Sequence, residues 1–299
     1  MSVVSAPQSA RVISAQPSVW GRLIELWQHR ELLGGMIRTQ LKIKYKNSFL
    51  GFLWSMVNPA LYLAVFYVVF QLILPGNIER FAIFLLSGLL VWNLFSVGLA
   101  GAVGSVTGQA GLVKKVSFPR ALLPLAAVGS AVFHFLLQSI VLVLALVIAR
   151  QDVGWEYMWL VPIALVTLVV FTSALGVFLA AVNVGMRDTQ HFLELALLAW
   201  FWCTPVVYGY MLVGQRSGWM ATLYKCNPVL WIVLPFQRAL YNISYTLPNK
   251  AGVASPLLPT NSPWWYAWHV LVVLAVSSVG FVLAMVYFGR VEGNFAEEL

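Results

Sequence analysis

Residues 112–149 read LVKKVSFPRALLPLAAVGSAVFHFLLQSIVLVLALVIA, and this stretch decides the class of fold. From Ala121 to Ala149 it contains no Asp, Glu, Lys or Arg. As a helix it is long enough to cross the hydrocarbon core of a bilayer, which is roughly 30 Å thick. Lys114, Lys115 and Arg120 precede this apolar run. The stretch therefore predicts a basic turn in water followed by a helix in the membrane.

The composition extends this interpretation to the whole chain. Of the 299 residues, 61% are hydrophobic and 9% are charged. Soluble domains average roughly half apolar and about a quarter charged residues. These values predict an all-α integral membrane protein and leave no room for a large soluble domain.

Six segments have the length and apolar character of membrane-spanning helices. They cover about residues 49–74, 81–107, 121–149, 159–184, 191–213 and 265–287. Between the last two lies a proline-broken stretch, 214–264, which contains NPVLWIVLPFQRALY. This apolar run is too short to span, so we expect a re-entrant or interfacial element that is buried in protein or lines a cavity.

The distribution of Lys and Arg predicts the orientation, because short cytosolic loops of membrane proteins are enriched in both. Threading the six segments places Lys114, Lys115, Arg120 and Arg187 on the same side as the N-terminus. The short loops on the other side hold only Arg80 and Arg150. We expect a multi-pass protein of the plasma membrane with both termini in the cytosol. The formal charge of +8 then reflects topology and attraction to anionic lipids, and it does not indicate nucleic acid.

The segment before the first span predicts a helix in the cytosolic interface. Residues 1–24 are rich in Ser, Ala, Pro and Gln, so we expect a disordered lead-in. Residues 29–46 alternate apolar and basic positions at helical spacing, although KIKYK also suits a short strand. This amphipathic helix has two interpretations: a membrane anchor, or a surface that attracts a lipid diphosphate. The second assigns the role to Arg38, Lys42, Lys44 and Lys46.

The first span carries aromatic residues at helical spacing. The successive spacings are four, one and three residues, and the residues are Tyr62, Phe66, Tyr67 and Phe70. Aromatic rings on a spanning helix commonly pack against lipid or other helices. The alternative is a path along which sugar rings slide, stacking on aromatic planes.

Two basic turns are candidates for contact with a partner protein. One contains Lys114, Lys115, Phe118, Pro119 and Arg120, in which we expect Phe118 to be an exposed aromatic flanked by cations. Most basic turns of this kind serve topology alone.

The second candidate turn is GMRDTQ, with Arg187 and Asp188 side by side between two spans. Threading places it on the same side of the membrane as the first basic turn. We expect both turns to take part in coupling this chain to a partner protein.

Motifs for chemistry are missing from the sequence. It contains no GxxxxGK[ST] phosphate loop, no HExxH and no GxSxG. Cys203 and Cys226 lack the spacing of metal ligands. We therefore predict no catalytic residue, metal or cofactor in this chain, and favour transport driven by a separate subunit. A proton-coupled carrier and a membrane-bound transferase are the alternatives from other classes.

Four segments in a fixed order resemble those of ABC-2 type permeases that export polysaccharides and teichoic acids. They are RTQLKIKYKNSFLGFLWSMVNP (38–59), LVKKVSFPRALLPLA (112–126), VNVGMRDTQHFLELALLAWFWCTPVVY (182–208) and NPVLWIVLPFQRALY (227–241). The resemblance covers about residues 25–299, which would form one transmembrane domain.

This resemblance implies the membrane half of an ABC transporter in a bacterial plasma membrane. Two copies of the chain would form the conduit, and two copies of a separate ATPase subunit would bind ATP and Mg²⁺. Residues 29–46 match the interface helix of the family, and the turn around 114–120 matches its coupling helix.

The substrate implied is a polyprenyl-diphosphate-linked polysaccharide, such as O-antigen or, in mycobacteria, the galactan precursor of the cell wall. Its diphosphate would enter near the interface helix and its sugars would pass the aromatic residues. Teichoic acid is the alternative cargo.

Overall fold

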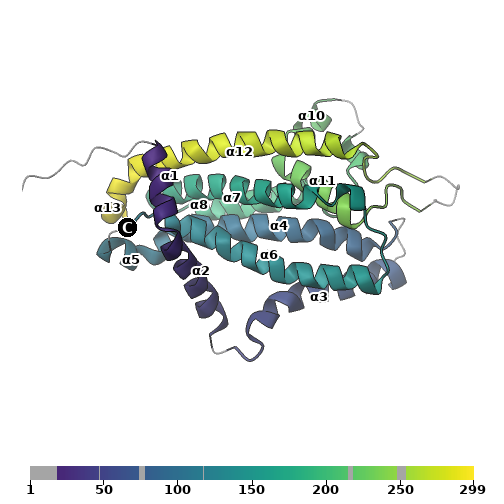
Figure 1. Cartoon of the computed structure of the whole chain (residues 1–299), viewed down its shortest axis with the longest axis horizontal. Helices are drawn as coiled ribbons and strands as arrows, with labels where there is room; N and C mark the ends of the chain where they lie inside the picture. Colours follow the sequence, from purple (N-terminus) through teal and green to yellow (C-terminus); the bar gives the residue numbers. More distant parts are fainter. Residues whose placement is uncertain (1–18, 47, 74–77, 117, 215–217, 248–253) are drawn as a thin grey trace, which may run out of the picture.

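The computed structural model describes residues 19–46, 48–73, 78–116, 118–214, 218–247 and 254–299. It is a bundle of long, roughly parallel helices, which Figure 1 shows lying along the long axis of the molecule. Within the described residues, β-type pairing is limited to one isolated bridge, between Tyr245 and Pro256. The predicted all-helical membrane fold is confirmed.

Five helical segments are long and apolar enough to cross a membrane within the described residues. They are Gly51–Phe70, which includes α3 (Trp54–Tyr67), α4 (Phe81–Gly104), α6 (Leu122–Ile148), α7 (Leu160–Gly185) and Pro263–Asn294, which includes α12 (Pro263–Val291). Short 3-10 or π turns cover Gly51–Leu53, Val68–Ile73, Thr107–Gln109, Trp155–Tyr157 and Glu292–Asn294.

Helix α4 is the centre of the bundle. It packs against α3, α6, α7, α8 and α11, and 83% of its most apolar stretch is buried. A helix that is apolar all round fits such a position, because no polar face requires water. Gly98 allows a close approach, since an added Cβ would lie 3.2 Å from Cβ of Ala131 on α6. Gly176 of α7 faces Ala102 in the same way, with 2.7 Å between the added Cβ and that of Ala102.

The fifth expected span, 191–213, is not one continuous helix. Helix α8 (Thr189–Trp202) ends before Thr204 and Pro205, and α9 (Met211–Gly214) and α10 (Trp219–Lys225) follow. Pro205 cannot donate a backbone hydrogen bond, so a helix is readily interrupted there. The continuous helix expected from hydropathy is therefore replaced by a helix and a buried turn.

Asn227 satisfies the polar groups that this interruption exposes. Its Nδ2 donates to the carbonyl oxygen of Cys203 at 3.1 Å and to Oγ1 of Thr204 at 3.0 Å. Its Oδ1 accepts from Nε1 of Trp200 at 2.8 Å and from the backbone N of Val229 at 3.0 Å. The last bond caps helix α11 (Pro228–Leu240), so one amide side chain joins the end of α8 to the start of α11.

Helix α11 is the short apolar element expected within the proline-broken stretch. It is buried almost throughout, packed on α4, α7 and α12. Gln237 Nε2 donates to the carbonyl oxygen of Pro205 at 2.8 Å, which ties α11 to the turn after α8.

The N-terminal helices begin earlier than expected. Helix α1 (Val19–Gln28) occupies the end of the range 1–24 that the sequence suggested as a lead-in, and residues 1–18 lie outside the described part. Leu26 of α1 packs against the bundle, which accounts for helical order in this stretch. Helix α2 (Arg30–Tyr45) includes KIKY, so the helical interpretation holds there and the strand does not.

The bundle has two distinct ends (Figure 1). At the left of the view lie α1, α5 (Ala110–Lys115) and α13 (Phe295–Glu298), and we call this the hairpin end. At the right lie the connections before α4, between α6 and α7, and between α11 and α12, and we call this the loop end.

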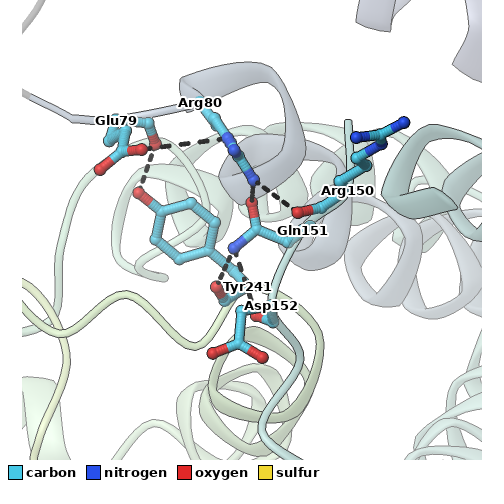
Figure 2. Close-up of polar contacts among 6 residues, drawn as sticks. All are labelled: Glu79, Arg80, Arg150, Gln151, Asp152 and Tyr241. Carbon is cyan, nitrogen blue, oxygen red and sulfur yellow. Dashed lines mark hydrogen bonds and ion pairs between the residues drawn. The ribbon is translucent and has the colours of Figure 1, made fainter. Parts of the chain in front are cut away.

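Hydrogen bonds join three connections at the loop end (Figure 2). Arg80, in a left-handed backbone conformation with φ 48°, donates to Oε1 of Gln151 at 2.8 Å. Gln151 Nε2 donates to the carbonyl oxygen of Tyr241 at 2.7 Å, and the Tyr241 hydroxyl donates to the carbonyl oxygen of Glu79. The start of α4, the end of α6 and the end of α11 are thereby held together.

Candidate functional site

The basic hairpin projects from the hairpin end of the bundle. Lys114 and Lys115 are exposed in the last turn of α5, and the chain then becomes extended at Val116. Leu112 and Val116 are exposed apolar residues, with exposed fractions of 38% and 49%. Val116 follows the end of α5, and its backbone N donates to the carbonyl oxygen of Leu112 at 3.0 Å. Two cations and two apolar side chains of the hairpin are therefore exposed, and Leu112 and Val116 also line a cavity of about 590 Å³ together with Met36 and Ile43 of α2.

Phe118 is not the exposed aromatic that the sequence suggested. It is half-buried and packs against the apolar cluster that includes Val106 and Phe295. A bulky aromatic next to a proline loses most of its contact with water when a neighbouring cluster can receive it. Leu112 and Val116 are instead the exposed apolar residues of the hairpin, and their position beside Lys114 and Lys115 was the signal that could have found them.

A charged joint attaches the hairpin to the end of α12. The backbone N of Arg120 donates to Oε1 of Glu292 at 2.9 Å, and the Arg120 guanidinium donates to the Glu292 carbonyl oxygen. Arg22 of α1 lies 4.0 Å from the same carboxylate. Sequence reasoning missed Glu292 and Arg22, because both are far from residue 120 in the chain.

Gly289 makes room for Arg22 against α12. The Arg22 guanidinium donates to the carbonyl oxygens of Gly289 at 3.0 Å and Met285 at 3.4 Å. An added Cβ at Gly289 would overlap the Arg22 guanidinium. Glycine at this position therefore leaves room for the Arg22 guanidinium to reach the backbone of α12.

The second predicted coupling turn lies next to the hairpin. Arg187 and Asp188 are both exposed between α7 and α8. Arg187 lines a cavity of about 340 Å³ together with Thr107, Ala110 and Leu299. The structure thus brings Arg187 beside the start of the hairpin and the C-terminal residue.

The four basic residues of the interface helix do not share one face. Arg38 and Lys42 are four residues apart and lie on one stripe of α2, whereas Lys44 lies about 200° around the helix from Lys42. Lys46 follows the end of α2. Partial enclosure lowers the pKa of Lys44, because burial disfavours its charged form.

The predicted aromatic residues of the first span separate into two groups. Phe66 and Phe70 stack on each other at 5.8 Å and both contact Phe81 of α4, so they pack helix against helix. Tyr67 is half exposed. Tyr62 contacts Phe66 at 6.3 Å and also lines a cavity between α3 and the bundle.

That cavity has a volume of about 390 Å³ and receives side chains from α2, α3, α4 and α6. Many of these side chains are polar: Lys44, Tyr45, Ser55, Asn58, Asn93, His134 and Gln138. Sequence reasoning did not group them, because four separate helices contribute them.

Comparison with known proteins gives concordant matches. The ABC-2 type transporter family matches residues 31–241. The O-antigen export system permease protein RfbA of Myxococcus xanthus is 34% identical over 234 residues, which cover 78% of this chain and 87% of that protein. A protein of the same name from Klebsiella pneumoniae is 29% identical over 212 residues, covering 71% of this chain and 81% of that protein.

Proposed function

Because the chain belongs to the ABC-2 type transporter family, we propose that it is the permease subunit of a bacterial exporter of polyprenyl-diphosphate-linked polysaccharide. The observation that carries the substrate class is the 34% identity, over most of both chains, with an O-antigen export permease. A separate ATPase subunit would bind ATP and Mg²⁺ and supply the energy. Two copies of each subunit would form the complex.

Export in a reconstituted system tests this function. The chain and the ATPase subunit of its own system are placed in proteoliposomes with a lipid-linked O-antigen fragment. We expect the glycan to become accessible to a lectin on the far side of the membrane only when ATP is present. The control is an ATPase subunit that binds but does not hydrolyse ATP. Transfer of the glycan without the ATPase subunit would contradict the proposal.

We further propose that the chain crosses the membrane six times, with both termini in the cytosol. Helix α8 and the turn after it would form the fifth crossing, and α9 to α11 would re-enter from the outer side. Burial of the interruption after α8 and the partners that Asn227 provides support this arrangement, since irregular backbone at membrane depth requires both.

Labelling of single cysteines tests the orientation. In a background with Cys203→Ser and Cys226→Ser, we expect Lys115→Cys to react with an impermeant reagent only from the cytosolic side. Trp155→Cys, at the loop end, should react only from outside. The opposite pattern would overturn the proposed orientation.

The surface that couples to the ATPase subunit would be the hairpin face, by which we mean its exposed residues Lys114, Lys115, Leu112 and Val116. Exposed apolar side chains flanked by cations suit a protein contact. The joint at Glu292 would pass the movement of the hairpin to α12, and from there to α7, on which α12 packs extensively.

A pair of substitutions distinguishes this surface from the neighbouring core. Val116→Asp should leave the chain folded and abolish stimulation of the ATPase by the permease. Phe118→Asp should instead lower the thermal stability of the isolated chain, because Phe118 packs in an apolar cluster. Normal ATPase coupling in Val116→Asp would exclude the hairpin face as the contact.

The lipid diphosphate would first meet the stripe of Arg38 and Lys42 on α2. Replacing both with Gln should weaken capture of a diphosphate lipid and leave capture of an uncharged polyprenol unchanged. Equal loss for the two lipids would leave α2 with an anchoring role alone.

A further inference from the structure

The polar cavity lies between α2, α3, α4 and α6, each of which contributes side chains to its wall. Asn93 is near the middle of α4, and His134 and Gln138 are near the middle of α6, one turn apart. Polar side chains in the middle of spanning helices are costly and usually face a binding site or a path for solutes. Their convergence on one cavity therefore calls for an occupant.

Two side chains in this cavity lack hydrogen-bond partners among the described residues. His134 is only 8% exposed, and its Nε2 has no partner. The hydroxyl of Tyr45 is also buried without a partner, and the two rings lie 5.8 Å apart between centroids. An unpaired buried polar group destabilises a protein by about 1–3 kcal/mol, so water or a polar ligand has to supply the missing bonds at this cavity.

The hydrogen bonds of His134 define what this ligand must offer. Nδ1 of His134 lies 2.6 Å from the carbonyl oxygen of Ser130, and only a protonated Nδ1 can donate to that oxygen. In the neutral ring Nε2 is therefore an acceptor that requires a donor from the ligand. The diphosphate of a lipid-linked glycan is esterified at both ends and has only acceptors to offer at neutral pH, so it leaves Nε2 of the neutral ring unpaired.

The other side chains of the cavity favour the same class of ligand. Tyr45, Asn58 and Asn93 can each donate and accept, which matches sugar hydroxyls that do both. Trp54 and Tyr62 add flat aromatic surfaces on which the CH face of a sugar ring can lie.

We propose that this cavity binds a single sugar unit through its hydroxyl groups, with His134 Nε2 accepting from one of them. This proposal rests on the proposed export of a glycan, and it places a contact between that glycan and a single copy of the chain. Lys44, at the edge of the cavity, would accommodate a nearby negative charge on the same ligand.

Ligand-observed NMR on the full chain in lipid nanodiscs tests the site. Saturation transfer to a panel of methyl glycosides, including those of galactose, glucose and mannose, reports contact with sugar. We expect at least one glycoside to bind, and His134→Phe to weaken its binding about tenfold or more, the loss of roughly one strong hydrogen bond. His134→Gln retains an acceptor and should restore part of the affinity. Asn93→Leu should weaken binding independently.

His269→Phe is the matched control. His269 also bonds through Nδ1 to the carbonyl oxygen four residues before it, at 2.8 Å, but it lies on α12 outside this cavity. Its replacement should leave glycoside binding unchanged, and thermal melting of each variant confirms that it is folded.

Three results would overturn the proposal. One is binding of no glycoside, and another is equal binding by the wild type and His134→Phe. The third is binding of inorganic phosphate at this cavity, detected by ³¹P NMR and lost in Lys44→Met, without glycoside binding. The assay uses neither ATP nor the ATPase subunit. A negative binding result would therefore not contradict the export function, and a negative export result would not contradict sugar binding at this cavity.

Discussion

Gly289→Ala tests whether α1 is held across α12 by Arg22 in the way the structure shows. Alanine in place of glycine ordinarily stabilises a helix, by about 0.8–1.0 kcal/mol. At Gly289 the new Cβ would overlap the Arg22 guanidinium, so the guanidinium must move. It then loses its bond to the Gly289 carbonyl oxygen, which measures 3.0 Å, and its approach to Glu292.

The magnitude follows from these opposing contributions. A hydrogen bond to a charged group contributes about 1.5–3 kcal/mol, and the ion pair at 4.0 Å adds less than about 1 kcal/mol. The gain in helix propensity offsets part of this loss, so the net change in the free energy of unfolding is a destabilisation of about 1 kcal/mol. Gly280→Ala, on the same helix, is the matched control, because its nearest neighbour is Cβ of Ala174 at 3.9 Å. The control should be neutral or stabilised by up to about 1 kcal/mol.

The assay is thermal unfolding of the purified chain in nanodiscs. At about 2–4 °C per kcal/mol, Gly289→Ala should melt roughly 2–8 °C below Gly280→Ala. In an Arg22→Ala background the penalty of Gly289→Ala should disappear, since the two positions interact directly. Equal melting temperatures for the two glycine variants, or an unchanged penalty without Arg22, would refute the placement of Arg22 over Gly289.

Three further predictions concern the rest of the bundle. Gly176→Ala should destabilise the chain by about 1–3 kcal/mol through overpacking against Ala102, and Ala102→Gly in the same chain should recover most of the lost melting temperature. Asn227→Ala should cost at least about 2 kcal/mol, because it leaves the cap of α11 and the end of α8 unpaired, and limited proteolysis should then cleave near the turn after α8. Gln151→Leu should remove the bonds that join Arg80 and the Tyr241 carbonyl oxygen through Gln151 and speed hydrogen exchange at the loop end. Unchanged exchange would show that the network in Figure 2 contributes little.

Hydropathy located the long helices well because burial in lipid requires only length and apolar composition. Helices α4, α6, α7 and α12 lie within a few residues of the expected segments. The same criterion joined residues 191–213 into one span, because an apolar turn buried in protein has the composition of an apolar helix. What distinguishes them is the set of hydrogen bonds from Asn227, and composition carries no information about that set.

In the candidate site, too, some features could be predicted from the sequence and others depend on the tertiary structure. The basic hairpin was located from Lys114, Lys115 and Pro119, since charges and a proline between two apolar runs mark a turn in water. Phe118 was expected to be exposed because Lys115 and Arg120 flank it in a basic turn. In space it packs against an apolar cluster that contains residues of α13 and of the segment after α4, and this packing decides its burial.

By itself the sequence determined that this chain is a helical membrane protein with a basic hairpin and an amphipathic N-terminal helix, because these properties depend on residues adjacent in the chain. Only the tertiary structure decided that Arg22, Arg120 and Glu292 meet at one joint, and that Tyr45, Asn93 and His134 share one cavity. These groups come from helices far apart in sequence. Hydrogen bonds and burial act over a few ångströms, so they depend on which helices pack together, and the packing of the whole bundle determines that.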